Sequence, residues 1–145
     1  MEPTKLRFSN ADDAARLMVK YQRRYQMIRK YFAEITELWH AVANTHLQGS
    51  VTVEPLDDAN NHFVGTILGH PFEGRIEPQL STDGVVAKLT ITTRDANNRT
   101  VTKSTYLFTK DSDVHSQDGN VLIEREHPNC EFLWLIDAAT AAISS

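Results

Sequence analysis

The stretch from Ala14 to His46, AARLMVKYQRRYQMIRKYFAEITELWHAVANTH, decides the fold because its apolar and aromatic residues recur in steps of four and three. This spacing places side chains along one side of a helix. The stripe consists of Ala14, Met18, Tyr21, Tyr25, Ile28, Phe32, Ile35, Trp39, Val42 and His46. Gly and Pro, which interrupt helices, do not occur between Thr4 and Gln48. The pattern therefore predicts one long helix.

The residues that flank this stretch predict where the helix begins and ends. Ser9 followed by Asp12, with Asp13 adjacent, is a capping-box pattern with an acidic first turn. Gly49 stands where a left-handed residue is expected after a helix. A helix of about 38 residues is about 57 Å long, whereas a compact domain of 145 residues is only about 38 Å across. We therefore expect part of the helix to extend beyond the domain.

Length and composition predict one domain without a membrane-spanning segment. The chain has 145 residues, of which 41% are hydrophobic, and this suffices for a single core. It lacks an apolar run of about 18 residues, and its charged N-terminus does not resemble a signal peptide. The single cysteine, Cys130, cannot form an internal disulfide. We expect one cytoplasmic, non-membrane domain over residues 1–145, with residues 1–8 as a flexible tail.

After the helix, runs rich in Val, Ile and Thr predict an antiparallel sheet. The clearest strand is 85–93, in which apolar and polar residues alternate. Further strands are expected at 50–54, 62–68, 75–80, 100–109 and 121–124. Pro78 lacks a backbone donor and would confine its segment to a sheet edge. Short loops between successive strands favour a meander over crossover connections.

A glycine-rich loop and a final helix complete the predicted architecture. Segment 69–74 lacks the Lys-Ser/Thr ending of a phosphate-binding loop, so we interpret it as a wide connection or a bulge. Segment 129–143 is predicted to be a helix with Asn129 as N-cap, although 132–136 could also form a buried strand. The expected buried face of this helix comprises Phe132, Leu135, Ile136, Ala139 and Ile143.

Together these elements predict an α+β fold: a long N-terminal helix packed on an antiparallel meander of about five strands, with a short C-terminal helix. In outline, this order resembles the cystatin-like arrangement, in which a sheet wraps one long helix. The chain contains no motif of that family, so the resemblance concerns architecture and carries no functional residues.

The charges along the predicted helix are uneven. Between residues 14 and 33 there is no Asp or Glu, whereas six residues are basic, namely Arg16, Lys20, Arg23, Arg24, Arg29 and Lys30. Because the whole chain carries −4, the remainder carries −10. The basic stretch is interpreted as a solvated face or as a docking surface for an acidic protein. Nucleic acid is disfavoured because the rest of the molecule is acidic and because Tyr21 and Tyr25 lie on the apolar stripe.

Two patterns contain metal-ligating residue types without completing a metal site. Glu37 and His40 share one helix face, as in di-iron bundles, but this motif occurs only once in the chain. Segment 111–119 begins like a calcium loop, but Ser116 replaces the required Gly and Leu122 replaces the twelfth-position acid. We therefore predict no metal or cofactor, and we interpret 111–119 as a polar hairpin loop.

Cys130 lies close to His127 at the start of the predicted C-terminal helix. The helix dipole there would lower the pKa of a thiol, as a nucleophile requires. A lone cysteine beside Phe132 is more often a small buried residue. The chain therefore shows no catalytic signature, which favours a non-enzymatic function.

The leading hypothesis is a protein-interaction module that forms a homodimer, with an adaptor or chaperone-like role as a variant, or that binds an acidic protein. Its aromatic helix would supply the interface. The expected partner-binding residues are Met18, Tyr21, Arg24, Tyr25, Ile28 and Tyr31. Leu17, Tyr31 and Leu38 form an additional row that is expected to contact the partner. The later half of the stripe, from Phe32 to Val42, is expected to pack in the core.

The alternative is a small-molecule-binding or catalytic domain with a pocket between the curved sheet and the helices. The expected pocket residues are Trp39, His62, Phe63, Tyr106, Phe108 and Trp134. His62 would supply acid–base chemistry there.

Overall fold

The computed structural model describes residues 10–57, 59–82 and 84–145, which form two helices and seven strands. The elements are α1 (Ala11–His46), β1 (Val51–Val53), β2 (His62–Ile67), β3 (His70–Ser81), β4 (Gly84–Arg94), β5 (Thr100–Phe108), β6 (Val114–His115), β7 (Val121–Ile123) and α2 (Cys130–Ile143). This confirms the predicted α+β class. The predicted tail lies outside the described residues.

α1 is a single helix of 36 residues, about 54 Å long at about 1.5 Å per residue. Its N-cap is Asn10, whose side chain accepts hydrogen bonds from the backbone N–H groups of Asp12 (2.8 Å) and Asp13 (3.4 Å). Ser9, the N-cap expected from the sequence, lies outside the described residues. At the other end, Gly49 has a φ of 84°, in the left-handed region that the sequence predicted.

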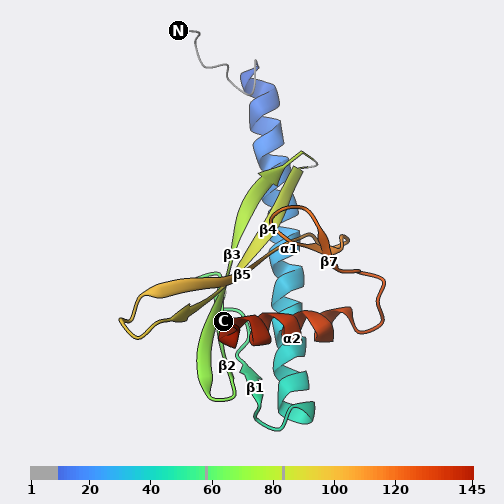
Figure 1. Cartoon of the computed structure of the whole chain (residues 1–145). Helices are drawn as coiled ribbons and strands as arrows, with labels where there is room; N and C mark the ends of the chain where they lie inside the picture. Colours follow the sequence, from blue (N-terminus) through green and yellow to red (C-terminus); the bar gives the residue numbers. More distant parts are fainter. Residues whose placement is uncertain (1–9, 58, 83) are drawn as a thin grey trace.

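The strands form one antiparallel meander in the order β1 to β7, and Figure 1 shows the sheet curling beside α1. The structure corrects the expected count of about five strands. β6 is a two-residue strand within the segment predicted to be a loop. Pro78 lies in the part of β3 that pairs with β4 but extends past the end of β2, so its missing N–H disrupts no ladder there.

The glycine-rich segment 69–74 is not a wide connection, which corrects that prediction. β2 and β3 are joined by a tight turn in which Leu68 and Gly69 have φ values of 50° and 81°. In the β2–β3 register, Phe63 lies opposite Gly74. A Cβ on Gly74 would lie only 2.2 Å from the Phe63 ring, so this glycine leaves room for an aromatic side chain. Gly74, which the sequence suggested was part of a loop, is therefore a strand residue that leaves space for the Phe63 ring.

The core lies between the sheet and the later half of α1. Phe32 is fully buried, and its ring centroid lies 5.8 Å from Trp39 and 5.3 Å from Phe108. Within α1 the first buried residue is Ile28, and the buried set is Ile28, Phe32, Ile35, Thr36, Trp39 and Ala43. This confirms the assignment of Phe32, Ile35 and Trp39 to the core. At the end of the stripe, Ala43 is buried, whereas Val42 is only half-buried.

α2 crosses the later half of α1 and closes the core (Figure 1). Asn129 is its N-cap, as predicted, but its side chain makes no capping hydrogen bond. The predicted buried face is partly wrong, because Phe132 and Ile143 are 38% and 44% exposed. The buried residues of α2 are Cys130, Trp134, Leu135, Ala138, Ala139 and Ala142. The small side chains of Ala138, Ala139 and Ala142 let α2 approach its neighbours closely, while Trp134 packs among the aromatic rings of the core.

Candidate functional site

The first half of α1, from Ala11 to Met27, projects past most of the sheet (Figure 1). Met18 and Met27 are 60% and 58% exposed, and Val19 is also exposed. Leu17 and Tyr21 are half-buried. About 25 Å of amphipathic helix, at about 1.5 Å per residue, therefore has apolar side chains that the rest of the described chain does not fully cover.

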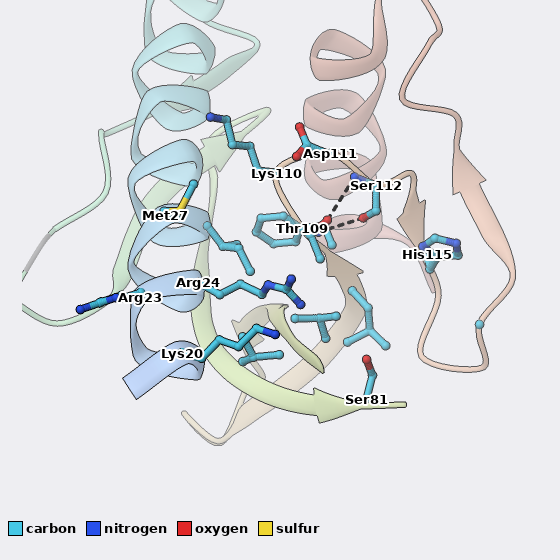
Figure 2. Close-up of a pocket in the computed structure, with 16 residues that line it drawn as sticks. Lys20, Arg23, Arg24, Met27, Ser81, Thr109, Lys110, Asp111, Ser112 and His115 are labelled. Carbon is cyan, nitrogen blue, oxygen red and sulfur yellow. Dashed lines mark hydrogen bonds between the residues drawn. The ribbon is translucent and has the colours of Figure 1, made fainter. Parts of the chain in front are cut away.

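Beside this half of α1 lies the groove, a cavity of about 850 Å³ between α1, the ends of β3 to β5 and the loop that follows β5. It is lined by Lys20, Arg23, Arg24, Met27, Ile28, Ser81, Val85, Val86, Leu107, Phe108, Thr109, Lys110, Asp111, Ser112, His115 and Gly119. Figure 2 shows the α1 side chains on one side of the groove and the loop after β5 on the other. Lys20, Arg24 and Lys110 therefore border a largely apolar wall, whereas Arg23 points away from it in Figure 2.

The wall of the groove exists because β5 ends before β4 does. The β4–β5 register runs from Arg94 opposite Thr100 to Ala87 opposite Phe108. Residues 84–86 of β4 pair with β3, and among the described residues no strand pairs with their other side. The backbone N–H of Ile76 donates away from β4, to the Asn61 carbonyl (3.0 Å), so its partner Leu89, and with it Val85, directs its N–H and C=O groups to the side that β5 leaves open. Val85 is only 3% exposed, so other parts of the chain largely cover this side.

The loop after β5 is held by reciprocal hydrogen bonds. The backbone N–H of Thr109 donates to Ser112 Oγ (2.9 Å), and the backbone N–H of Ser112 donates to Thr109 Oγ1 (3.1 Å), as Figure 2 shows. Ser112 Oγ donates in turn to the Asp113 carbonyl (2.9 Å). These bonds fix a turn that carries Lys110 and Asp111 on the rim of the groove.

Arg24 lies between α1 and the start of β4. A Cβ built on Gly84 would be 2.6 Å from Arg24 Nη1, so the guanidinium group lies directly over this glycine. Gly84 also has a φ of 121°, which L residues rarely adopt. Gly is therefore required at position 84 for two reasons: its φ is one that other residues rarely adopt, and a Cβ there would collide with Arg24.

The structure divides the residues that the sequence assigned to the partner surface. Met18 and Arg24 are exposed, and Tyr21 is half-buried. Ile28 is 2% exposed and belongs to the core, so it leaves the predicted surface. Tyr31 packs under the guanidinium of Arg125 at 5.0 Å and accepts a hydrogen bond from it. Ile28 and Tyr31, the C-terminal part of the predicted partner surface, are thus engaged in contacts within the chain.

Tyr25 marks the boundary between the two halves of α1. Its hydroxyl oxygen is buried and has no hydrogen-bond partner among the described residues. Burial raises the pKa of Tyr25 above its ordinary value, against the opposing effect of Arg29. Leu17 of the additional row is half-buried, whereas Leu38 is 45% exposed in the later half of the helix.

The residues predicted to line a ligand pocket fill the core instead. Phe108 and Trp134 have ring centroids 4.8 Å apart, and Tyr106 lies 6.1 Å from Trp134. The five aromatic residues Trp39, Phe63, Tyr106, Phe108 and Trp134 are each at most 2% exposed. Their rings occupy the space between the sheet and the helices where the pocket was expected, which corrects that prediction.

His62 does not join this cluster. It precedes Phe63 in β2, and successive strand residues point to opposite faces of a sheet. Its carbonyl accepts a hydrogen bond from the backbone N–H of Asp57 (2.8 Å), while its Nδ1 is buried without a partner among the described residues. The predicted combination of His62 with the aromatic residues in one acid–base pocket is therefore not formed.

The remaining sequence motifs have structural roles. His40 Nδ1 donates to the Val53 carbonyl (2.6 Å), which ties edge strand β1 to α1. Asp113 Oδ1 accepts from the backbone N–H of Arg125 (2.7 Å), so the acidic loop is fixed to the segment before α2. Within the described ranges, no three His, Cys, Asp or Glu side chains are grouped closely enough to hold a metal ion.

The electrostatic expectation for Cys130 is reversed. The thiol is buried, and burial, together with the neighbouring Glu131, raises its pKa instead of lowering it. His127 Nδ1 accepts a hydrogen bond from the backbone N–H of Asn129 (3.0 Å), a contact within its own turn. Burial thus favours the protonated thiol, which is the less nucleophilic form.

The sequence prediction missed the half of the groove contributed by residues after β4. Lys110 directly follows the predicted strand 100–109, and Leu107 appeared only as part of that strand. The bounds of the predicted strands 85–93 and 100–109 do not give the register between them. That register, which leaves Val85 and Val86 without a partner in β5, is decided by strand pairing. Only the fold brings these residues to the basic face of α1.

Comparison with family models, curated proteins and solved structures gives no match for this chain. Neither α1 nor α2 combines the length and the continuous apolar character needed to cross a membrane, within the residues that the structure describes.

Proposed function

We propose that this chain is a non-enzymatic protein-interaction module that forms a homodimer through the exposed first half of α1. The observation that carries the proposal is the continuation of the apolar stripe over Ala14, Met18 and Tyr21, before the first buried residue of the helix at Ile28. Most of the stability of a helix in a protein comes from packing of its amphipathic face, so a second chain packed on this side would stabilise the exposed half of α1.

The order of charges along the exposed half supports an antiparallel pair of helices. The first turn is acidic, with Asp12 and Asp13, and the turns that follow are basic, with Arg23 and Arg24. In an antiparallel pair, the acidic turn of one helix lies beside the basic turns of the other. A parallel pair would instead place like charges side by side, at a cost in free energy.

Sedimentation equilibrium over a range of micromolar concentrations tests this proposal. We expect a dimer that dissociates on dilution. We also expect a double substitution, Met18→Glu with Tyr21→Glu, to shift the equilibrium to the monomer, because it places carboxylates on the apolar stripe. The matched control is Gln22→Glu with Gln26→Glu, which adds the same charge to exposed positions of the same helix.

A chain that remains monomeric at the highest of these concentrations contradicts the homodimer. Equal weakening by the two double variants would also contradict it, because the effect would then come from total charge and not from the stripe. Circular dichroism and thermal unfolding of both variants establish that any loss of dimer is not a loss of fold.

A further inference from the structure

We propose that a second copy of this chain docks the basic side of its exposed α1 half on the α2–β7 groove, an acidic and apolar depression between α2 and the last strand of the sheet. The lining of the α2–β7 groove includes Leu122, Glu124, Leu133, Ile136, Asp137 and Thr140. The basic side of α1 consists of Arg16, Val19 and Arg23. This contact is separate from the homodimer surface on the apolar stripe and goes beyond that proposed function.

The α2–β7 groove is a cavity of about 490 Å³ with exposed apolar walls. Leu133, Ile136 and Thr140 recur in steps of three and four, so they lie on one side of α2, which is not the side that packs in the core. Leu133 is 40% exposed. β7 is the last strand of the sheet, and its Leu122 is 47% exposed. Both walls of the groove therefore have apolar side chains that another chain could bury.

The charge of the α2–β7 groove favours a cationic partner. Among the described residues that line it are the carboxylates of Glu124 and Asp137 but no Lys or Arg. Segment 111–145 has seven acidic residues and one basic residue, a net charge of −6. That basic residue, Arg125, stacks on a tyrosine ring of α1. Lys103, which lies on the other side of Asp137, donates to a backbone carbonyl after α2 (3.0 Å). The negative potential at the groove would attract exposed cations of another chain.

The basic side of α1 has the complementary chemistry. Arg16, Val19 and Arg23 recur in steps of three and four, and each lies about 100° or more around the helix from Met18. A dimer through the apolar stripe therefore leaves this side uncovered. Val19 is 46% exposed, and Figure 2 shows Arg23 pointing away from the strands. The basic side thus presents one apolar residue between two cations.

The two surfaces match in length, and only separate copies can bring them together. Leu133 and Thr140 are seven residues apart on α2, as Arg16 and Arg23 are on α1, and seven helical residues span about 10.5 Å. Within one chain α2 crosses the later half of α1, whereas the basic side lies on the half that projects past most of the sheet (Figure 1). The occupant of the groove is therefore the α1 helix of a second copy.

Each part of the basic side has a counterpart in the groove. Val19 would gain burial against Leu133. The aliphatic stems of the two arginines would cover the apolar walls, while their guanidinium groups reach the carboxylates of Glu124 and Asp137. Because the contact joins two different surfaces of the same chain, it is heterologous and links copies, or dimers, one after another.

Sedimentation velocity of the full chain at low ionic strength tests the proposal. We expect species heavier than a dimer to form as the concentration rises and to dissociate in about 0.5 M salt, which screens exposed charges. Glu124→Arg is expected to weaken this association by about fivefold or more, since it replaces an attraction with a repulsion. The matched control, Glu126→Arg, reverses an exposed charge outside the groove lining and is expected to change the association by less than about twofold.

A second matched pair tests the apolar walls. Leu133 and Phe132 are neighbours on α2 with exposed fractions of 40% and 38%, but only Leu133 lines the groove. Leu133→Ala is expected to weaken the association by about threefold or more, and Phe132→Ala by less than about twofold. Circular dichroism and thermal unfolding of the variants establish that any loss of association is not a loss of fold.

A charge exchange tests whether these two surfaces meet. Arg16→Glu is expected to weaken the association as Glu124→Arg does, and a chain with both changes is expected to recover part of it, because the signs on the two surfaces are then exchanged. No recovery in the combined variant, or equal weakening by Glu124→Arg and Glu126→Arg, would overturn the proposal. So would Glu124-dependent binding of an unrelated basic helical peptide by a chain whose copies do not associate, since the occupant would then be another protein.

Met18→Glu with Tyr21→Glu keeps the two proposals distinguishable. It disrupts the apolar stripe but leaves the α2–β7 groove and the basic side in place, so we expect association that depends on Glu124 to persist. If the unmodified chain forms no dimer through the stripe yet associates in a Glu124-dependent way, the homodimer fails and the groove proposal holds. If it forms only a dimer that the stripe variant removes and Glu124→Arg leaves unchanged, the homodimer holds and the groove proposal fails.

Discussion

The two halves of α1 have the same spacing of apolar residues but different surroundings. In the later half, Phe32 and Trp39 are at most 1% exposed beneath the sheet and α2. In the first half, Met18 occupies an equivalent position in the stripe and is 60% exposed. The comparison shows that periodicity identifies which side of a helix is apolar, whereas the length of the sheet determines how much of that side the chain itself covers.

The largest difference between the halves is expected from truncation of their central apolar residues. Phe32→Ala removes a ring that packs against four other aromatic rings, so we expect the free energy of unfolding to fall by about 3–5 kcal/mol. Met18→Ala at an exposed position is expected to change it by about 0.5 kcal/mol or less. Urea denaturation at the lowest workable protein concentration measures both, and similar losses would contradict the division of α1.

A smaller difference is expected from two threonines of the later half that differ in their partners. Thr36 is buried, and its Oγ1 accepts a hydrogen bond from the backbone N–H of Leu56 (2.9 Å). Thr36→Val leaves that donor without its partner and is expected to cost about 1–3 kcal/mol. The matched control is Thr45→Val, because exposed Thr45 Oγ1 donates only within α1, to the Ala41 carbonyl (2.8 Å). If Thr45→Val lowers the free energy of unfolding as much as Thr36→Val does, the loss comes from helix propensity and not from the hydrogen bond between Leu56 and Thr36.

The smallest expected effect is a dependence of the free energy of unfolding on pH, caused by Tyr106 in the core that covers the later half of α1. Burial, then the hydrogen bond that Tyr106 Oη donates to Asp137 (2.5 Å), raises the pKa of Tyr106 well above its ordinary value of 10.0. The folded state therefore keeps a proton that the unfolded state loses, so stability is retained below pH 10 and falls as the pH rises above it.

We expect this group to contribute a loss of roughly 1 kcal/mol per pH unit above pH 10, which Tyr106→Phe abolishes. Chemical denaturation of both proteins between pH 8 and pH 11, taken in about half-unit steps, measures the difference. Parallel pH profiles for the two proteins would show that Tyr106 ionises equally in the folded and unfolded states.

Much of the secondary structure could be predicted because it depends on local chemistry. The stripe predicted α1, alternation predicted the strand at 85–93, and Asn129 marked the start of α2. Local patterns failed where packing chose between two conformations. Gly74 resembled a loop residue, but it accommodates the ring of Phe63 in a strand. At the end of α1, Ala43 replaced Val42 in the core, because a straight helix drifts by about 20° per heptad from a repeat of 3.5.

The candidate sites divide in the same way. Met18, Tyr21 and Arg24 could be selected from the sequence, since exposure on a helix follows from length and periodicity. Lys110, Leu107 and Val86 could not, since the sheet register and the turn after β5 carry them to α1. The predicted aromatic pocket failed because composition does not show whether rings surround a space or fill it; here the ring centroids of Phe32 and Phe63 are 5.9 Å apart.

By itself, the sequence determined the long helix, its apolar side, its basic face and the antiparallel meander, because each depends on residues within a few positions of one another. Only the tertiary structure decided that the stripe is covered from Ile28 onward, that the aromatic residues form a solid core, and that the pairing of β5 with β4 stops at Phe108, beside the basic residues of α1. These features depend on contacts between residues far apart in the chain, whose free energy arises only when the sheet, α1 and α2 pack together.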